Sequence, residues 1–259
     1  LKVIEIVKPR FLLFENVRGF NKGFFTTDNN GNEARTKAHS ELVAQELDNL
    51  GYQVFAEALI SSEAGVPQPR CRFVLLAIKK GDKALSNIEN NNFFSIFHSA
   101  IPEFRRRKGL PQYGDITTSM ALSDLETEGK PSIPCSDSPI PGFEQIDYKE
   151  PDSLTAYQAS LRDGMRPEEA PNSMRLVNHL IQTKNRFKEI LETCTPGQNI
   201  SIADRIRLGI KKHSITPLAP DKLAATMTTL PDDFIHYSEP RVLTVREMAR
   251  LQSFDDSFV

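Results

Sequence analysis

Apolar and polar positions at the start of the chain predict a short helix followed by a strand. Residues 1–8 have the spacing of the end of an amphipathic helix, which Pro9 terminates. Residues 10–14 form a short apolar run, typical of a strand that is buried on both faces. Glu15 and Asn16 follow at its carboxyl end, where open α/β sheets bind ligands. Because residue 1 is Leu rather than Met, we expect the chain to begin within a larger fold.

The next stretch predicts a loop, a helix and two strands. Residues 21–36 are rich in Asn, Gly and Thr, which is typical of a loop. A helix follows, and Gly51 is well placed as its left-handed cap. The apolar face of this helix consists of Val43, Leu47 and Leu50. Strands are predicted over residues 52–60 and 72–80, with a Gly- and Pro-containing turn between them, so this part of the chain resembles a piece of an α/β sheet with an antiparallel pair.

From residue 81 the pattern becomes irregular. Residues 81–175 are interrupted by Pro, Gly, Asn and Ser and show little sustained periodicity. Within them, residues 105–108 are a basic run, for which a solvated loop is the default interpretation and phosphate contact the alternative. Residues 174–194 predict the longest helix of this region. Its proposed inner face consists of Val177, Leu180, Ile181, Ile190 and Leu191. We interpret the region as a second module inserted into the first domain.

The last segment is ordered again. Thr244 and Glu247 have the spacing of a capping box, which marks the first turn of a helix. Arg246 and Arg250 are four residues apart and therefore lie on one face of that helix.

Composition excludes several classes of protein without selecting one. Of 259 residues, 39% are hydrophobic and 25% charged, which is ordinary for a globular protein with a sizeable core. The net charge of -2 gives no overall basic signature of nucleic-acid binding, although a basic cleft can be offset elsewhere. Cys71, Cys135 and Cys194 form neither a zinc pattern nor a disulfide framework. With no membrane-spanning run or signal peptide in this sequence, we expect a cytoplasmic protein.

The strongest candidate for chemistry is the block from Gly65 to Arg72, which precedes a strand. Arg70 and Arg72 lie one residue apart and point the same way from an extended backbone, after a turn that contains Gln68. Guanidinium groups placed in this way suit phosphate oxygens or the edge of a nucleobase. The alternative is that both are solvated charges at a strand edge.

Single acidic and imidazole side chains give weaker signals. Glu15 lies beside apolar residues, and desolvation there would raise its pKa enough to hold a proton for a ring nitrogen. The alternative, which these residues alone favour, is an acid near a helix N-cap or a surface carboxylate in an ion pair. His236 has no second His or Cys at ligand spacing, so we interpret it as structural rather than metal-binding. The sequence contains no serine-hydrolase, zinc-deaminase, metalloprotease or glycine-rich phosphate-loop motif.

Three blocks in this order resemble the later motifs of the DNA (cytosine-5) methyltransferases of bacterial type. They are Phe14-Glu15-Asn16-Val17, the Gln-x-Arg-x-Arg motif formed by Gln68, Arg70 and Arg72, and the closing block Arg241–Phe258. The combination is specific, whereas any one block alone is not. The resemblance occupies both ends of the chain, and the variable middle matches in placement only.

The resemblance implies roles for individual residues. Glu15 would contact the target cytosine at N3 and its exocyclic amine, with Asn16 positioning the site. Arg72 would lie at the cytosine O2, and Arg70 near the DNA backbone or the catalytic loop. The remaining implied roles are substrate contact for Gln68, Thr226 and Thr228, and structural support for Arg246 and Glu247.

The resemblance also implies a fold, a cofactor and a partner. Residues 1–80 would be the second half of a Rossmann-like catalytic α/β domain, residues 81–235 an inserted target-recognition domain, and residues 236–259 a return to the catalytic domain. The implied partner is double-stranded DNA, from which the cytosine is flipped. A thiolate would then add to C6 while Glu15 protonates N3, and C5 would take the methyl group of S-adenosylmethionine.

The sequence departs from the family pattern in three motifs. In the family, a Pro-Cys nucleophile motif and a glycine-rich cofactor motif precede the Glu-Asn-Val block, and a Gly-Asn motif follows the closing block. This sequence has none of the three at those positions. None of the three cysteines lies in a context that could replace the nucleophile. The favoured interpretation is part of a longer methyltransferase from a restriction–modification system. The alternatives are a DNA-recognition subunit of a split enzyme, completed by a complementary chain, or a non-catalytic DNA-binding remnant.

These departures predict that the isolated chain has no methyltransferase activity, because it lacks the thiol and the cofactor loop. Incubation with duplex DNA and radiolabelled S-adenosylmethionine should give no incorporation above background. Incorporation by the purified chain would contradict this prediction.

Overall fold

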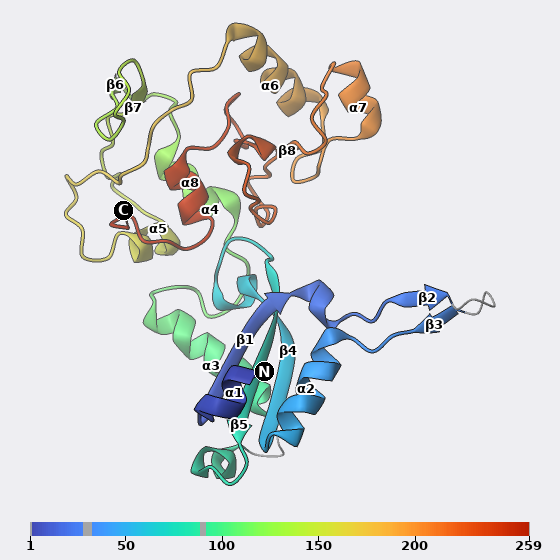
Figure 1. Cartoon of the computed structure of the whole chain (residues 1–259). Coiled ribbons are helices and arrows are strands. Elements are labelled where there is room, and N and C mark those ends of the chain that lie inside the picture. Colours follow the sequence, from blue (N-terminus) through green and yellow to red (C-terminus); the bar gives the residue numbers. More distant parts are fainter. Residues whose placement is uncertain (1, 28–32, 89–91, 259) are drawn as a thin grey trace. The chain divides into compact units, whose positions relative to one another are not determined.

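The computed structural model describes residues 2–27, 33–88 and 92–258, and these form two compact units. Unit 1 contains residues 1–61 and 70–101, and unit 2 contains residues 62–69 and 102–259 (Figure 1). The backbone therefore passes between the units three times. These boundaries do not coincide with the division at residues 80 and 235, which stays a prediction about function.

Unit 1 is built on a three-stranded antiparallel sheet in the order β1-β5-β4. Its strands are β1 (Phe11–Val17), β4 (Tyr52–Ile60) and β5 (Cys71–Lys79). Helices α1 (Lys2–Val7) and α2 (His39–Asn49) contribute Ile4 and Leu47 to one apolar cluster with the strands. Phe94 of α3 (Phe93–Arg107) belongs to a second cluster with Phe55 of β4. Helices thus cover both faces of the sheet (Figure 1).

Most elements predicted in the first eighty residues are confirmed. Helix α1 ends before Pro9, β4 spans the residues predicted for it, and β5 begins one residue earlier than predicted. Gly51 follows α2 with φ of +85°, the left-handed conformation that a helix cap of this type requires. The antiparallel pairing of β4 with β5 is also as predicted. A mixed α/β fold of this kind agrees with a methyltransferase fold.

Three predictions for residues 1–108 are wrong. Strand β1 is not buried on both faces: its side chains alternate between half-buried and exposed, and Leu13 is 73% exposed. The predicted loop over residues 21–36 contains a hairpin, β2 (Phe25–Thr27) paired with β3 (Glu33–Arg35), while residues 28–32 lie outside the described residues. The basic run at residues 105–108 is mostly the last turn of α3, a helix that the internal Pro102 conceals in the sequence.

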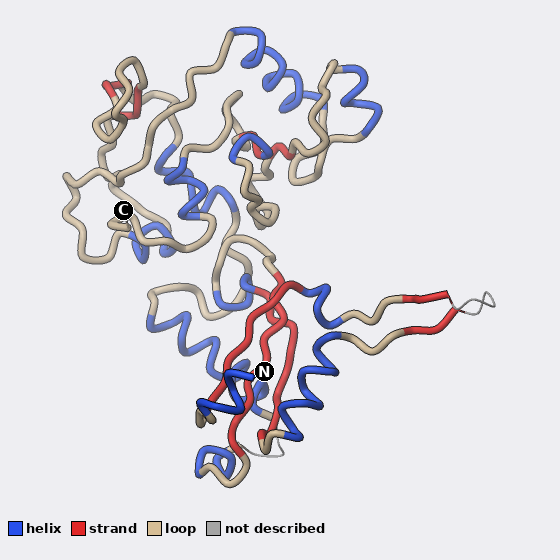
Figure 2. Tube along the Cα trace, in the orientation of Figure 1, coloured by secondary structure: helices blue, strands red, loops and turns tan. Residues whose placement is uncertain are grey.

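Unit 2 consists of short elements joined by long irregular segments, drawn in tan in Figure 2. Its helices are α4 (Thr118–Leu122), α5 (Ala156–Leu161), α6 (Ile181–Thr193), α7 (Ile202–Arg207) and α8 (Val245–Arg250). Its strands are β6 (Ser132–Pro134) paired with β7 (Glu144–Ile146), and β8 (Thr216–Pro217) paired with β9 (Phe234–Ile235). No helix in the described ranges is long and apolar enough to cross a bilayer.

The helix predicted over residues 174–194 begins only at Ile181. Met174 is buried in a cluster with Ile146 and Tyr148, and the Leu176 N–H donates to the carbonyl of Glu144, the first residue of β7. These contacts hold the preceding segment extended. Of the five residues predicted to form the inner face of the helix, Ile190 is buried, Leu191 packs partly against it, and the other three are exposed.

The segment that follows residue 235 packs inside unit 2. Leu243 and Leu251, on either side of α8, share one core with Ile116, Leu122 and Tyr157. The capping box at the start of α8 is confirmed, because Thr244 and Glu247 each accept the other's backbone N–H. The return of residues 236–259 to a catalytic domain stays a prediction.

Candidate functional site

The structure brings Glu15 and Arg72 together in unit 1. Glu15 lies near the end of β1 and Arg72 near the start of β5, and the two strands pair in antiparallel register. The Nε of Arg72 is 2.6 Å from Oε1 of Glu15, while its Nη1 donates to the Cys71 carbonyl at 2.9 Å. A guanidinium and a carboxyl group thus lie side by side and are accessible to solvent, with 26% and 59% of their side chains exposed.

This arrangement agrees with the alternative that the residues alone favour for Glu15, a surface carboxylate in an ion pair, rather than with a desolvated acid. Its carboxyl group is not enclosed by apolar neighbours; the side chain points to the exposed face and pairs with a cation. Asn16 lies on the opposite, half-buried face, and its Oδ1 accepts the Val17 N–H at 2.8 Å. The Arg70 N–H donates to Ser61 Oγ at 3.1 Å, which fixes the backbone at the point where β5 begins.

Gln68 lies in unit 2 and is 1% exposed. Its Nε2 donates to the Leu251 carbonyl at 2.9 Å, and its Oε1 accepts the Met227 N–H at 3.1 Å. The neighbouring Pro67 carbonyl accepts the Ala224 N–H at 2.9 Å. The side chain therefore joins the end of α8 to the turn that contains Thr226 and Thr228. Substrate contact by Gln68 stays a prediction, and the geometry indicates a positioning role.

Residues 226–228 alternate between exposed and buried positions. Met227 is buried in the main core of unit 2, whereas Thr226 and Thr228 are exposed on either side of it. Thr228 Oγ1 donates to Asp233 Oδ2 at 2.7 Å. The hydroxyl of Thr226 is therefore the better placed of the two for contact with another molecule.

Helix α8 presents charged side chains to the interior of unit 2. Glu247 is fully buried and accepts bonds from both terminal nitrogens of Arg241, each at 2.8 Å. Burial alone would raise the pKa of Glu247, but the charge and hydrogen bonds of Arg241 lower it to about 2. Arg246 is also buried and donates to the carbonyl oxygens of Asn172, Asp255 and Phe258. This is the packing that a structural role for Arg246 and Glu247 requires.

The sequence placed Arg250 on one helix face with Arg246 but predicted neither its burial nor its partners. The side chain is 0% exposed, and its Nη2 bonds to Asp124 at 2.9 Å and to Asp256 at 2.7 Å. Asp124 also accepts the Tyr148 hydroxyl at 2.9 Å. The available signal was Asp124 itself, an acid between the apolar residues Leu122 and Leu125. A buried acid requires a partner, although the sequence does not say which one.

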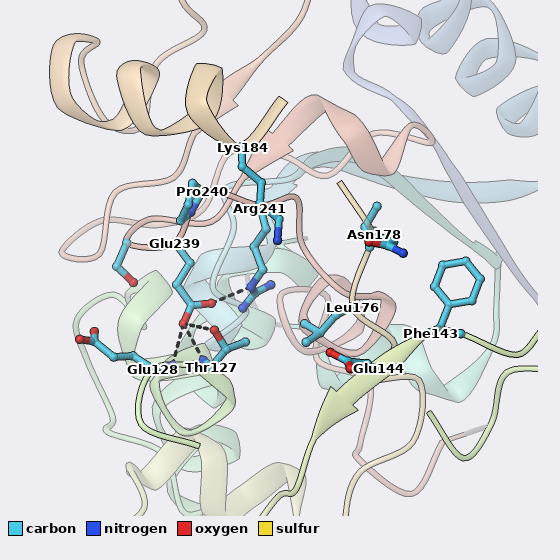
Figure 3. Close-up of a pocket in the computed structure, with 13 residues that line it drawn as sticks. Thr127, Glu128, Phe143, Glu144, Leu176, Asn178, Lys184, Glu239, Pro240 and Arg241 are labelled. Carbon is cyan, nitrogen blue, oxygen red and sulfur yellow. Dashed lines mark hydrogen bonds and ion pairs between the residues drawn. The ribbon is translucent and has the colours of Figure 1, made fainter. Parts of the chain in front are cut away.

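A cavity of about 570 Å³ opens in unit 2 beside Arg241 (Figure 3). Glu239 forms part of its wall and accepts bonds from the Thr127 N–H and hydroxyl and from Arg241 Nε. Figure 3 shows Lys184 and Asn178 among the other lining side chains. The wall is fixed by buried ion pairs, while Lys184 brings a cation from α6.

Two further side chains are held in states that do not favour metal binding or nucleophilic attack. His236 is fully buried, its Nδ1 lies 3.3 Å from the Ser238 N–H, and burial lowers its pKa. Cys135 follows Pro134, but burial and a hydrogen bond to Asp137 raise the pKa of its thiol. Within the described parts of the chain, no three His, Cys, Asp or Glu side chains form a group that could hold a metal ion.

Comparison with known proteins gives a match along the whole chain. The model of the C-5 cytosine-specific DNA methylase family matches residues 1–259. The type II methyltransferase M.XorII of Xanthomonas oryzae pv. oryzae is 26% identical over 100% of this chain and 53% of its own length. M.BanI of Aneurinibacillus aneurinilyticus is 24% identical over 100% of this chain and 66% of its own length. The chain thus spans about half to two thirds of the length of these curated relatives.

The fold also has a counterpart among solved structures. The crystal structure of a protein described as a DNA modification methyltransferase encoded within a prophage (E. coli) superposes with a TM-score of 0.53 and 18% identity. The superposition covers 98% of this chain and 61% of the chain in that structure. At this identity the likeness shows the fold alone.

Gln68→Leu should destabilise unit 2 by about 2 kcal/mol, because the Met227 N–H and the Leu251 carbonyl would be left buried without their partner. Urea denaturation followed by circular dichroism measures the change. Gln182→Leu, at an exposed position of α6, is the matched control and should alter stability by less than about 0.5 kcal/mol. Equal effects of the two substitutions would contradict the positioning role.

The free energy of unfolding should decrease as the pH falls below about 4.5, because Glu247 then loses the charge that pairs with Arg241. The folded-state pKa of Glu247 lies below its ordinary value of 4.5, so its contribution is complete above that pH and is lost as the pH falls toward 2. Glu247→Gln should reduce this pH dependence, measured as the urea midpoint between pH 7 and pH 2.

Glu103→Gln is the control for this measurement. Hydrogen bonds from Arg106 and Arg107 also lower the pKa of Glu103 to about 2, but on the exposed surface of α3. Its contribution should be smaller and should vanish in high salt, because exposed ion pairs are screened. A larger effect at Glu103 than at Glu247 would contradict the assignment.

Proposed function

Because the chain belongs to the C-5 cytosine-specific DNA methylase family, we propose that it forms part of a DNA (cytosine-5) methyltransferase that acts on double-stranded DNA. The observation that carries the proposal is the Glu15–Arg72 pair, in which a carboxyl and a guanidinium group lie 2.6 Å apart at neighbouring strand ends. The type II methyltransferase relatives favour this function over a non-catalytic DNA-binding remnant, and suggest a restriction–modification system.

The two side chains match the pairing edge of a cytosine. That edge presents the O2 acceptor, the N3 atom and the exocyclic amine in one row, and the cytosine must leave the base stack to reach such a site. Arg72 would donate to O2, and Glu15 would contact N3 and the amine. When a thiolate adds to C6, electron density grows on N3 and O2, so a proton held by Glu15 and the charge of Arg72 would stabilise that change.

Other residues would support this contact. The Asn16 amide, bonded to the backbone at the end of β1, would fix the direction of Glu15. Arg70, immediately before β5, would reach the DNA backbone or the catalytic loop. Thr226 and Thr228 would contact the substrate from unit 2, and Gln68 would hold their turn in place.

The methyl donor of this family is S-adenosylmethionine. The sequence contains no Gly-x-Gly, so the residues of this chain do not supply a glycine-rich cofactor loop. The raised pKa of Cys135 likewise disfavours it as the nucleophile. We propose that a longer polypeptide or a complementary chain supplies both, and that the enzyme acts in the cytoplasm, where bacterial DNA lies.

The proposal predicts that Glu15→Gln abolishes most activity once the missing parts are supplied. The chain would be fused to the amino-terminal part of a type II methyltransferase relative, and 5-methylcytosine in host DNA measured by bisulfite sequencing. Loss of the general acid should lower methylation by about 100-fold or more.

Glu57→Gln is the matched control, because Glu57 on β4 lies opposite Val74 of β5, as Glu15 does from β1. It should leave methylation close to that of the unmutated fusion. If Glu15→Gln and Glu57→Gln behave alike, the role of Glu15 is contradicted. A fusion that binds DNA and donor but forms no 5-methylcytosine would contradict the function itself.

A further inference from the structure

Positive charge in unit 2 is concentrated in the helical pair α6–α7 and the segment that follows it. Residues 181–213 contain seven Lys and Arg and three Asp and Glu, a net charge of +4, whereas the rest of the chain carries -6. A local excess of this kind is concealed by the overall charge of -2. It is the electrostatic footprint expected of a surface that faces a polyanion.

The acidic residues of this segment are already paired. Arg207 bonds to Glu189 at 2.8 Å and to Asp204 at 3.0 Å, and Lys188 lies 3.9 Å from Glu192. The remaining cations of residues 181–213, other than Lys212, form no ion pair with a described carboxylate. They are Lys184, Arg186, Arg205 and Lys211, of which all but Arg205 are exposed.

The helical pair holds these cations on a rigid support. Phe187 and Ile190 of α6 pack with Leu208, which follows α7, in a core of their own. Arg207 also donates to Thr193 at 2.8 Å, which closes α7 against the end of α6. Cations on a packed helix lose less conformational freedom on binding than cations on a loose segment.

The basic run at the end of α3 contrasts with this surface. Arg105 is buried and donates to the carbonyl oxygens of Glu63 and Gly114. Arg106 and Arg107 both bind the carboxylate of Glu103, at 2.7 and 2.9 Å. Three of the four charges in the most basic stretch of the sequence are therefore already engaged.

We infer that three cations of residues 181–213, Lys184 and Arg186 of α6 and Lys211 after α7, contact the phosphates of the DNA, rather than the basic run at residues 105–108. This inference rests on the proposed function. Lys184 also lines the cavity of Figure 3, so one of these cations lies at the edge of the cavity beside Arg241. Phosphate contacts carry affinity and position the duplex without reading its sequence.

The test compares two sets of charge removals in the full chain. Binding of a short mixed-sequence duplex is followed by fluorescence anisotropy over a range of NaCl concentrations. Lys184→Gln combined with Arg186→Gln and Lys211→Gln should weaken binding at least about tenfold and lower the salt slope by about 2 to 3. Arg106→Gln combined with Arg107→Gln should change both quantities little.

A third variant separates charge from shape. Lys184→Arg combined with Arg186→Lys and Lys211→Arg keeps the charges and should bind like the unmutated chain. Weaker binding by the glutamine variant with an unchanged salt slope, or a larger loss in the Arg106 and Arg107 variant, would overturn the inference and leave the proposed function standing. Failure of the unmutated chain to bind duplex DNA would overturn both.

Discussion

The ionised side chains inside unit 2 are the constraint on which much of that unit depends. Glu247 and Arg250 point inward from a helix of only six residues, where an unpaired charge would be very costly. Each is acceptable because a partner of opposite charge comes from elsewhere: Arg241 for Glu247, and Asp124 and Asp256 for Arg250. Replacing one partner would leave the other buried and unpaired, which typically costs about 3–5 kcal/mol. The ion pairs therefore specify where α8 must lie.

The same helix orders segments that are far apart in the sequence. Arg250 reaches a residue 126 positions earlier, and Gln68 reaches the Leu251 carbonyl across 183 positions. Through Gln68 the turn around Thr226 is joined to the end of α8. A region with little regular secondary structure can thus keep a defined shape, since polar side chains supply the connections that helices and strands supply in unit 1.

Local pattern predicted most of unit 1 and little of unit 2. Strand β4 and helix α2 with its cap at Gly51 depend on periodicity and on one backbone conformation, both of which are visible in the sequence. Helix α3 was missed because Pro102 argues against a helix, although its apolar residues pack on the sheet. The proximity of Glu15 and Arg72 was implied by the resemblance, which assigns both to one cytosine, whereas the pattern of residues did not show that β1 pairs with β5. The burial of Gln68 and Arg250 could not, because their partners are set by long-range packing.

The segment of residues 62–69 has a consequence for how related chains can be recombined. The residues that flank it belong to unit 1 and are joined by a hydrogen bond, from the Ser61 N–H to the Arg70 carbonyl at 3.0 Å. The segment itself belongs to unit 2. An exchange of residues 102–259 between two relatives would separate Gln68 from the carbonyl and amide groups that match it. A functional hybrid would need two transplanted pieces, the long one and this loop of eight residues. Unit 2 is therefore a discontinuous unit that cannot be exchanged as a single cassette.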